Sequence, residues 1–235
     1  MKNQSVIIVT NRKRNEFLES SIHSKTKRKT FLITKEEQFT YDQIIDLNPE
    51  WIFVPHWSKI IPAEIYENFR VVIFHMTDLP FGRGGSPLQN LIIRGFENTV
   101  ISAIQCTEEL DAGDIYLKEP LNLNGTADEI LLRASFVIEK MIIRILEENP
   151  TPIPQKGKVT FFQRRKPDQS KLDFENIQTL DQFYDYIRML DGEGYPNAFL
   201  EIGNFRIIFS SPHRRSGHLE SQVKIEYIDQ SSLGN

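Results

Sequence analysis

The sequence has a single cysteine, Cys106, and no apolar stretch long enough to cross a membrane. One thiol cannot close an internal disulfide, which fits a reducing compartment. No segment approaches the ~20 apolar residues that a transmembrane helix needs, and no apolar signal-peptide core follows Lys2. We therefore expect a cytoplasmic protein with no membrane partner. Because Cys106 lies within an apolar run, a buried structural thiol is favoured over a nucleophile.

The chain also has little net charge of either sign. Its 28 Lys and Arg residues against 32 Asp and Glu residues give a formal charge of −4 over 235 residues. Such a balance provides no general attraction to nucleic acid. The basic clusters at residues 25–29 and 164–166 are more typical of solvated loops. We expect small-molecule partners and no nucleic acid; the oligomeric state is left open, with a homodimer among the options.

Two chemical signatures are missing as well. The turn after the first apolar run, residues 10–14, contains no glycine, which argues against a dinucleotide site. It offers Arg12 and Arg14 to a phosphate-bearing substrate instead. No histidines recur at the spacing of paired metal ligands, so a metal site is disfavoured, although one histidine and three acids could supply ligands. These four residues are His75, Asp78, Asp111 and Asp114.

What the chain does have is a regular alternation of apolar runs and amphipathic segments. Strands are predicted at residues 5–10, 30–34, 51–55, 71–74, 100–107 and 115–121. Helices are predicted at residues 41–47, 61–69, 86–94 and 127–148, and Asn11 is expected to cap an earlier helix. The alternation predicts an α/β fold with a mostly parallel sheet and helices on both faces.

The composition changes after residue 148. A proline-rich segment at 149–157 is expected to be extended. Beyond it the pattern predicts a strand at 159–162, a helix at 180–190 and a hairpin at 198–209. We therefore divide the chain into a main domain at 1–150 and a small C-terminal α+β region at 151–235, whose last residues, 231–235, are expected to fray.

The segment after the fourth predicted strand carries the clearest functional signal. An apolar run ends on His75, and a loop with three glycines and two prolines follows. Ligands of open parallel sheets bind outside the carboxyl ends of the strands. Imidazole is suited to proton transfer or to a hydrogen bond to developing charge. The loop residues 82–85 could cradle a phosphate, although their pattern matches neither the P-loop nor the dinucleotide motif.

A second candidate is Asp111, in an acidic turn between two strands. One interpretation is an Asx turn with Gly113 at positive φ. The other is a carboxylate that faces His75 and is oriented for acid–base chemistry. The spacing alone leaves both interpretations open.

Together, His75-x-x-x-x-Pro80-x-x-Arg83-Gly84-x-x-Pro87 and the later Asp111-Ala112-Gly113 resemble the core motif of the folate-dependent formyltransferases. The resemblance covers about residues 1–150. It implies a Rossmann-like sheet without a dinucleotide, N10-formyltetrahydrofolate as co-substrate, and no metal. In the implied mechanism Asp111 handles the protons of the amine, and His75 stabilises charge on the formyl oxygen.

The family's catalytic asparagine, two residues before the histidine, is Ile73 here. Losing one such donor can cost about 10²–10³ in rate. The candidate replacements are Thr77, Asn90 and the backbone N–H groups of Gly84 and Gly85.

The resemblance also implies two binding regions. The family's folate loop follows the third strand, which places the donor site at Val54, Pro55, His56, Trp57 and Ile60. Trp57 offers a stacking surface or a core contact. A sugar nucleotide needs cationic and N–H partners for its diphosphate. The candidate acceptor residues are Asn11, Arg12, Arg14, Arg83, Gly84, Gly85, Arg94 and Tyr195, the last of which could equally belong to the core.

Within the family, the loop sequence resembles the branch that formylates sugar nucleotides of the pseudaminic-acid type. The implied acceptor is a UDP-4-amino-4,6-dideoxy-N-acetyl-hexose. Two alternatives stay open. One is a non-catalytic folate- or nucleotide-binding protein, which the missing asparagine allows, and the other is a formyltransferase that acts on another amine such as methionyl-tRNA.

Overall fold

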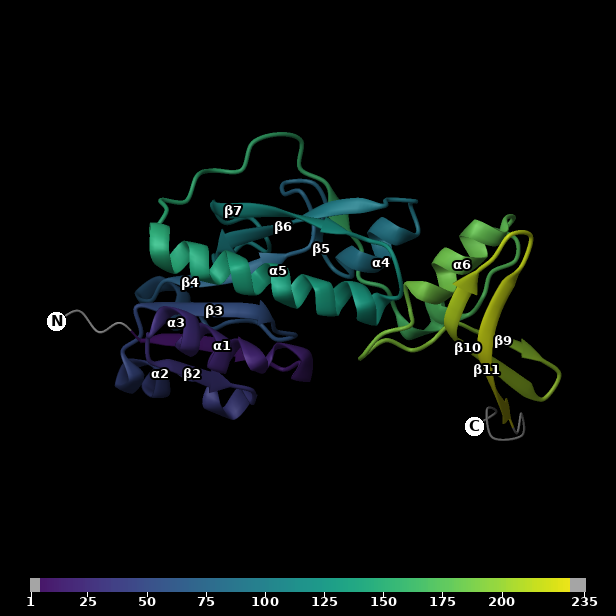
Figure 1. Ribbon diagram of the computed structural model, residues 1–235, viewed down its shortest axis with the longest axis horizontal. Coiled ribbons are helices and arrows are strands. Elements are labelled where there is room, and N and C mark those ends of the chain that lie inside the picture. The colour runs from purple at the N-terminus through teal and green to yellow at the C-terminus, as the bar shows by residue number, and fades with distance from the viewer. Residues whose placement is uncertain (1–4, 229–235) are drawn as a thin grey trace. The chain divides into compact units, whose positions relative to one another are not determined.

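The computed structural model describes residues 5–228. Within that range the chain forms two compact units (Figure 1). The first comprises residues 5–84, 99–121 and 132–162, and the second comprises residues 85–98, 122–131 and 163–228. The domain boundary expected at residue 150 stays a prediction.

The first unit is built on a six-stranded sheet with the order β2-β1-β3-β4-β6-β7. Its strands are β1 (Val6–Thr10), β2 (Thr30–Ile33), β3 (Trp51–His56), β4 (Val71–His75), β6 (Asn98–Gln105) and β7 (Ile115–Asn122). Strands β1 to β4 pair in parallel, whereas β6 runs antiparallel to β4. The predicted α/β class with a mostly parallel sheet is confirmed.

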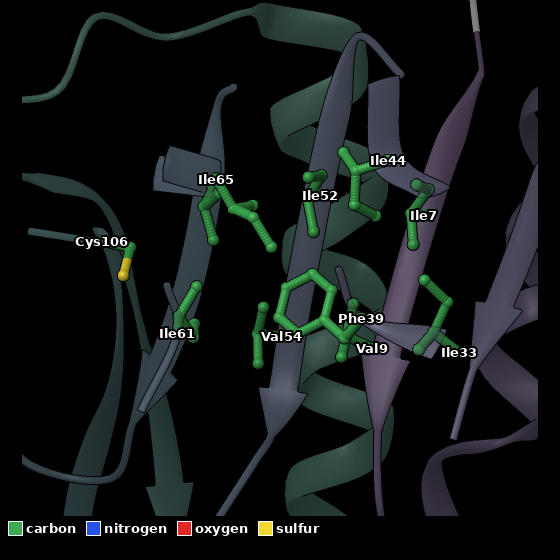
Figure 2. Close-up of a cluster of buried hydrophobic side chains, with 11 residues drawn as sticks. Ile7, Val9, Ile33, Phe39, Ile44, Ile52, Val54, Ile61, Ile65 and Cys106 are labelled. Atoms are coloured by element: carbon green, nitrogen blue, oxygen red, sulfur yellow. The ribbon is translucent and has the colours of Figure 1, made fainter. Parts of the chain in front are cut away.

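Helices cover both faces of this sheet because its strands are apolar on both sides. The helices are α1 (Phe17–Thr26), α2 (Tyr41–Leu47), α3 (Ala63–Asn68) and α5 (Ala127–Glu148). On one face, Ile7 and Ile52 share a buried cluster with Ile44 of α2 and Ile65 of α3 (Figure 2). Helix α5 passes behind the strands in the same view.

Helices α1 and α5 are also joined directly. The rings of Phe17 and Phe136 lie 5.3 Å apart, centroid to centroid. Ser21 donates a hydrogen bond to Glu139, and Lys25 Nζ lies 2.7 Å from Glu139 Oε1. A buried carboxylate therefore ties the two helices together through two donors on α1.

A short two-stranded sheet completes the first unit. Strands β5 (Arg83–Gly84) and β8 (Phe161–Phe162) pair in parallel. The pairing brings the glycine loop after β4 beside the end of the proline-rich segment. No helix of the described residues is long and apolar enough to span a bilayer.

The second unit contains α4 (Pro87–Ile92), α6 (Leu180–Arg188) and a three-stranded antiparallel sheet in the order β11-β10-β9. These strands are β9 (Phe199–Ile202), β10 (Phe205–Arg214) and β11 (Leu219–Tyr227). Helix α6 begins with a capping box, in which Thr179 and Gln182 satisfy each other's backbone N–H groups. The remaining elements are 3-10 helices at Lys13–Asn15, Glu36–Gln38 and Pro167–Ser170.

The structure corrects three details of the sequence analysis. Asn11 does not cap a helix, because a 3-10 turn intervenes before α1 and the Asn11 side chain donates to Ser58 Oγ. Helix α4 ends at Ile92, short of Arg94. Strand β11 was not predicted, and the expected fraying of residues 231–235 lies outside the described residues.

We expect the α1–α5 contact to make stability depend on pH. Burial raises the pKa of Glu139, but hydrogen bonds from Lys25 and Ser21 outweigh it and hold the pKa below its ordinary value of 4.5. A lowered folded-state pKa stabilises the protein above pH 4.5, and that stabilisation is lost as the pH falls through the folded-state value. Glu139→Gln should therefore lower the free energy of unfolding at pH 7 by about 1–2 kcal/mol.

Urea unfolding at pH 7 and at pH 3 measures this effect, and the difference between variant and wild type should shrink at the lower pH. Glu148→Gln, at the exposed end of the same helix, is the matched control and should cost less than about 0.5 kcal/mol. An equal cost for both variants at pH 7 would contradict the assignment.

Candidate active site

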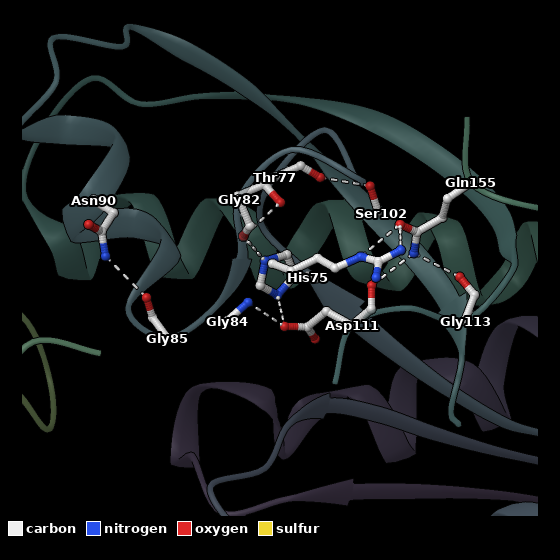
Figure 3. A network of polar contacts seen from close by, with 11 residues as sticks. His75, Thr77, Gly82, Gly84, Gly85, Asn90, Ser102, Asp111, Gly113 and Gln155 are labelled. Atoms are coloured by element: carbon white, nitrogen blue, oxygen red, sulfur yellow. Dashed lines mark hydrogen bonds and ion pairs between the residues drawn. The ribbon is translucent and has the colours of Figure 1, made fainter. Parts of the chain in front are cut away.

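His75 is the last residue of β4, and its ring lies between two acceptor oxygens (Figure 3). Nε2 is 2.8 Å from the carbonyl oxygen of Gly82, and Nδ1 is 3.4 Å from Asp111 Oδ2. A carbonyl can only accept, so Nε2 carries a hydrogen. Nδ1 then faces a carboxylate oxygen, and a favourable contact needs one more proton between the two groups.

Asp111 lies in the loop between β6 and β7, with a backbone φ of +54°. One of the two interpretations placed a positive φ at Gly113; the structure shows it at Asp111 instead, and aspartate tolerates the left-handed conformation better than most residues. Gly113 is needed for a different reason, because a Cβ there would lie 1.8 Å from the carbonyl oxygen of Gln105. The loop can pass this close to β6 only without a side chain.

The carboxylate of Asp111 is held in place by the backbone. The N–H of Gly84 donates to Oδ2 at 2.9 Å, so Oδ2 receives both this bond and the His75 contact. In the part of the chain that the structure describes, both recorded contacts of the carboxylate fall on Oδ2. Oδ1 takes part in neither of these two contacts. Both side chains are largely buried, with 7% of each residue exposed.

Gln155 fixes the Asp111 loop from the other side. Its Nε2 donates to the carbonyl oxygens of Asp111 at 2.8 Å and Gly113 at 2.9 Å. Its Oε1 accepts from Arg83 Nη2 at 2.8 Å and Nε at 3.2 Å. The amide thereby connects the β5 strand to the loop that carries the carboxylate. Sequence reasoning missed Gln155, because nothing marks it within the proline-rich segment.

Arg83 is turned inward rather than toward solvent. It is 8% exposed, and its Nη1 forms an ion pair with Glu109 Oε1 at 2.9 Å. With the two Gln155 contacts and this ion pair, the guanidinium is bound by side chains of the protein itself. The predicted binding of a substrate phosphate stays untested, and the observed contacts favour a positioning role.

The position of the family's asparagine is part of the core. Ile73 packs against Leu79, Ile104 and Ile115. The expected replacements are already engaged: Thr77 is fully buried, and the Gly84 N–H is bound to Asp111. In the second unit, Asn90 Nδ2 donates to the carbonyl oxygens of Gly85, Ser86 and Gln163.

The predicted folate loop follows β3 in the first unit. Val54 and Pro55 are buried, and Trp57 is half-buried with its ring edge-on to Phe39 at 5.7 Å. Ile60 is 94% exposed, an unusual environment for isoleucine. Asn11 reaches this loop through its side-chain bond to Ser58, and its backbone N–H donates to the carbonyl oxygen of His56 at 3.4 Å.

The remaining predicted residues belong to both units and are described within each. Arg12 is half-buried, and its Nε is a buried donor without a partner among the described residues. In the second unit, Arg94 donates to the backbone and side chain of Asn90, and Tyr195 lies half-buried in a turn closed on Gly192. Their proposed substrate contacts stay predictions.

Cys106 and Asp78 are the two other candidate residues, and both make contacts within the protein. Cys106 is buried in the core, and burial together with the nearby charge of Asp111 raises the pKa of its thiol to about 11. At neutral pH that thiol is protonated and unreactive. Asp78 pairs with Lys118, and residues 5–228 contain no group of three or more His, Cys, Asp or Glu placed to hold a metal ion.

Comparison with known proteins places this site in a family. A family model described as formyl transferase matches residues 3–145, and one described as the C-terminal domain of methionyl-tRNA formyltransferase matches residues 167–226. The methionyl-tRNA formyltransferase of Bacillus cytotoxicus is 30% identical over 164 residues, which is 66% of this chain and 52% of that protein. The chain thus spans about half the length of the curated relatives it matches.

Solved structures extend the similarity over nearly the whole chain. A methionyl-tRNA formyltransferase from Clostridium thermocellum superposes with a TM-score of 0.91 at 47% identity, over 95% of this chain and 99% of that one. A sugar N-formyltransferase from Shewanella superposes with a TM-score of 0.65 at 17% identity, over 93% and 96% of the two chains, which shows a shared fold. The matched residues include the loop of His75 and the turn of Asp111, and the chain belongs to the formyl transferase family.

Proposed function

We propose that this protein transfers a formyl group from N10-formyltetrahydrofolate to the amino group of a nucleotide-linked amino sugar. The observation that carries the chemistry is the His75–Asp111 pair, buried at the end of β4 and held by the Gly84 N–H. Family membership supplies the reaction class and the folate co-substrate. The acceptor is argued separately, from charge.

In the proposed reaction the acceptor nitrogen attacks the formyl carbon and forms the new C–N bond. Asp111 Oδ1 takes a proton from that nitrogen, which becomes acidic as it attacks. Negative charge develops on the formyl oxygen, and the Nδ1–H of His75 turns toward it. The 3.4 Å separation from Asp111 is long for a charge-assisted hydrogen bond, so this donor is not fully engaged before reaction.

The carbonyl of the formyl group then re-forms, and the bond between the formyl carbon and N10 of the folate breaks. N10 takes up the proton held by the His75–Asp111 pair. The products are tetrahydrofolate and the formylated amine. No further donor is assigned at the Ile73 position, which is apolar and packed. The burial of the pair compensates in part, because each hydrogen bond is electrostatically stronger away from water.

The loop after β3 fits a donor with a flat ring. Ile60 presents its side chain to solvent, and Trp57, three residues earlier in the same loop, is only partly buried. Apolar and aromatic side chains that are not fully covered suit an apolar contact with a pteridine. We assign Val54, Pro55, His56, Trp57 and Ile60 to this donor site.

The acceptor assignment rests on the charge of the C-terminal region. Residues 167–226 contain ten Asp and Glu against six Lys and Arg, a net of −4. Each of the six cations already forms an ion pair with a carboxylate of the same region. A polynucleotide is bound chiefly by unpaired Lys and Arg contacts to phosphates. The charge of this region therefore favours a small acceptor.

Methionyl-tRNA is the second candidate acceptor. The observation in its favour is the 47% identical structure, which is named as a methionyl-tRNA formyltransferase and is matched over 99% of its chain. The acidic C-terminal region argues against it. The two acceptors are distinguished by direct assay.

The assay incubates the purified protein with N10-formyltetrahydrofolate and either UDP-4-amino-4,6-dideoxy-N-acetyl-hexose or charged methionyl-tRNA. We expect mass spectrometry to detect one added formyl group on the sugar nucleotide and none on the tRNA. Formylation of the tRNA alone would overturn the acceptor assignment while leaving the chemistry intact. Absence of formyl transfer to either acceptor, with folate binding retained, would favour a non-catalytic binding protein.

The catalytic pair is tested by His75→Ala and Asp111→Asn. Each variant should lower kcat/KM for the accepted amine by at least ~10², because each removes a group that acts on developing charge or on the transferred proton. Asp114→Asn, a carboxylate in the same loop with no contact to His75, is the matched control and should stay within about threefold of wild type. Near-normal turnover in both site variants would refute the mechanism.

Gln155 is expected to act as a positioning residue. Gln155→Ala releases the Asp111 loop and should lower kcat by about tenfold while changing the KM values little, since misplacement by ~1 Å can cost more than that. Gln155→Glu keeps an acceptor for Arg83 but places a carboxylate oxygen against two carbonyl oxygens, so it should be no better than alanine. Circular dichroism would verify folding, and a Gln155→Glu variant with normal kcat would contradict the role.

A further inference from the structure

The outer strand of the C-terminal sheet has an open edge. Strand β11 lies at one end of the order β11-β10-β9 and pairs only with β10 among the described residues. The opposite edge is covered at its start, where the Leu172 N–H donates to the carbonyl oxygen of Phe199 in β9 at 2.7 Å. Proteins usually shorten, cover or twist away an exposed strand edge. With nine residues, β11 is long for an edge left uncovered.

The ladder geometry identifies which backbone groups face outward. Ile228 N–H donates to Asn204 O at 2.7 Å, and Phe209 N–H donates to Ala198 O at 2.9 Å. In an antiparallel ladder, successive residues direct their hydrogen-bonding groups to opposite sides. With the observed register, Gln222, Lys224 and Glu226 therefore bond toward β10. Val223, Ile225 and Tyr227 direct their N–H and C=O groups away from the sheet.

The same three residues carry largely apolar side chains with high exposed fractions: 49% for Val223, 64% for Ile225 and 67% for Tyr227. They lie on one face of the sheet, opposite Phe209, Ile207 and Phe205 respectively. Helix α6 covers part of that face, where Phe183 packs on Phe209 with ring centroids 6.1 Å apart. The remaining apolar surface adjoins the open edge, which is typical of a protein interface.

The charged side chains of β11 indicate which strand pairs with its open edge and in which register. On the other face of β11, Lys224 and Glu226 form an ion pair within the strand. We infer that β11 pairs antiparallel with β11 of a second copy of this chain, centred on Ile225. This register places Lys224 opposite Glu226 of the second copy, twice by symmetry, and Val223 opposite Tyr227. The interface is isologous, as a two-fold dimer requires.

Neighbouring registers are disfavoured by the same charges. Centring on Lys224 would set two lysines face to face, and centring on Glu226 would do the same with two glutamates. Centring on Val223 would oppose Glu226 and Glu220. Directly opposed like charges destabilise a ladder, whereas opposite charges stabilise it. Only the Ile225 register uses the outward backbone groups, the apolar face and the charges together.

The oligomeric state tests this inference. Sedimentation equilibrium of the full chain should give twice the chain mass for wild type. Lys224→Glu opposes two carboxylates and Glu226→Lys opposes two ammonium groups, so each should raise the dimer dissociation constant at least about tenfold. Ile225→Asp should do the same by removing the central apolar contact. Lys140→Glu, an exposed charge change on α5, is the control and should leave the dimer unchanged.

The two charge variants also complement each other. A mixture of Lys224→Glu and Glu226→Lys chains should form a heterodimer, because every cross-strand pair then joins opposite charges. The doubly swapped chain, with both changes, should form a homodimer again. Recovery in the mixture also shows that the single variants are folded.

Hydrogen exchange adds a residue-level readout. The amides of Val223, Ile225 and Tyr227 should exchange slowly in wild type and rapidly in Lys224→Glu. A monomeric wild type at tens of micromolar, or a dimer that neither charge variant weakens, would overturn the inference. So would a failure of the mixed variants to associate.

Discussion

The structure of the candidate site depends on one constraint: the carboxylate of Asp111 must be held against His75 although its loop has no regular structure. The backbone there is left-handed, and the turn has no ladder of its own to fix it. Three hydrogen bonds from outside the loop do so, one from the Gly84 N–H and two from Gln155 Nε2. The position of the His75–Asp111 pair is thus set by β5 and by the segment that leads to β8.

This arrangement explains why the surrounding residues are small or buried. A Cβ at Gly84 would lie 2.6 Å from the carbonyl oxygen of Phe162, and the left-handed φ of +104° would strain any other residue. Arg83, next to it, would be costly to bury without partners, and Gln155 and Glu109 provide them. The motif residues therefore serve the placement of Asp111 as much as any direct contact with substrate.

Much of the first unit could be predicted from the sequence because its signal is local. Four apolar runs alternate with amphipathic segments, and right-handed parallel crossovers follow from that order. His75 could be singled out because it ends a buried run before a glycine-rich loop. Its partner Asp111 could be proposed only together with the family motif, since 36 positions separate the two residues and spacing alone leaves an Asx turn equally open.

The features that were missed depend on contacts between distant segments. Gln155 is an ordinary polar residue in a proline-rich stretch, and its role exists only once Arg83 and the Asp111 loop converge on it. One interpretation of the sequence explained Gly113 by a positive φ, whereas the close approach of the Gln105 carbonyl is what excludes a side chain there. Strand β11 alternates apolar and polar residues, but both of its faces are partly exposed. No buried face therefore marks it as a strand in the sequence.

The choice between a sugar nucleotide and a tRNA as acceptor depends on surface charge rather than on the chemistry of the site. In the proposed mechanism the His75–Asp111 pair acts only on an amine and a formyl carbon, so the mechanism does not distinguish a sugar from an aminoacyl-tRNA. Discrimination must come from the surfaces that bind the rest of the acceptor. Each phosphate neutralised by a protein cation contributes to polynucleotide affinity through released counterions. A region whose six cations are all paired, and which keeps a net charge of −4, supplies little of that term. The proposal of a smaller acceptor rests on this charge balance, whereas the 47% identity to a chain named for tRNA is attributed to the shared catalytic fold.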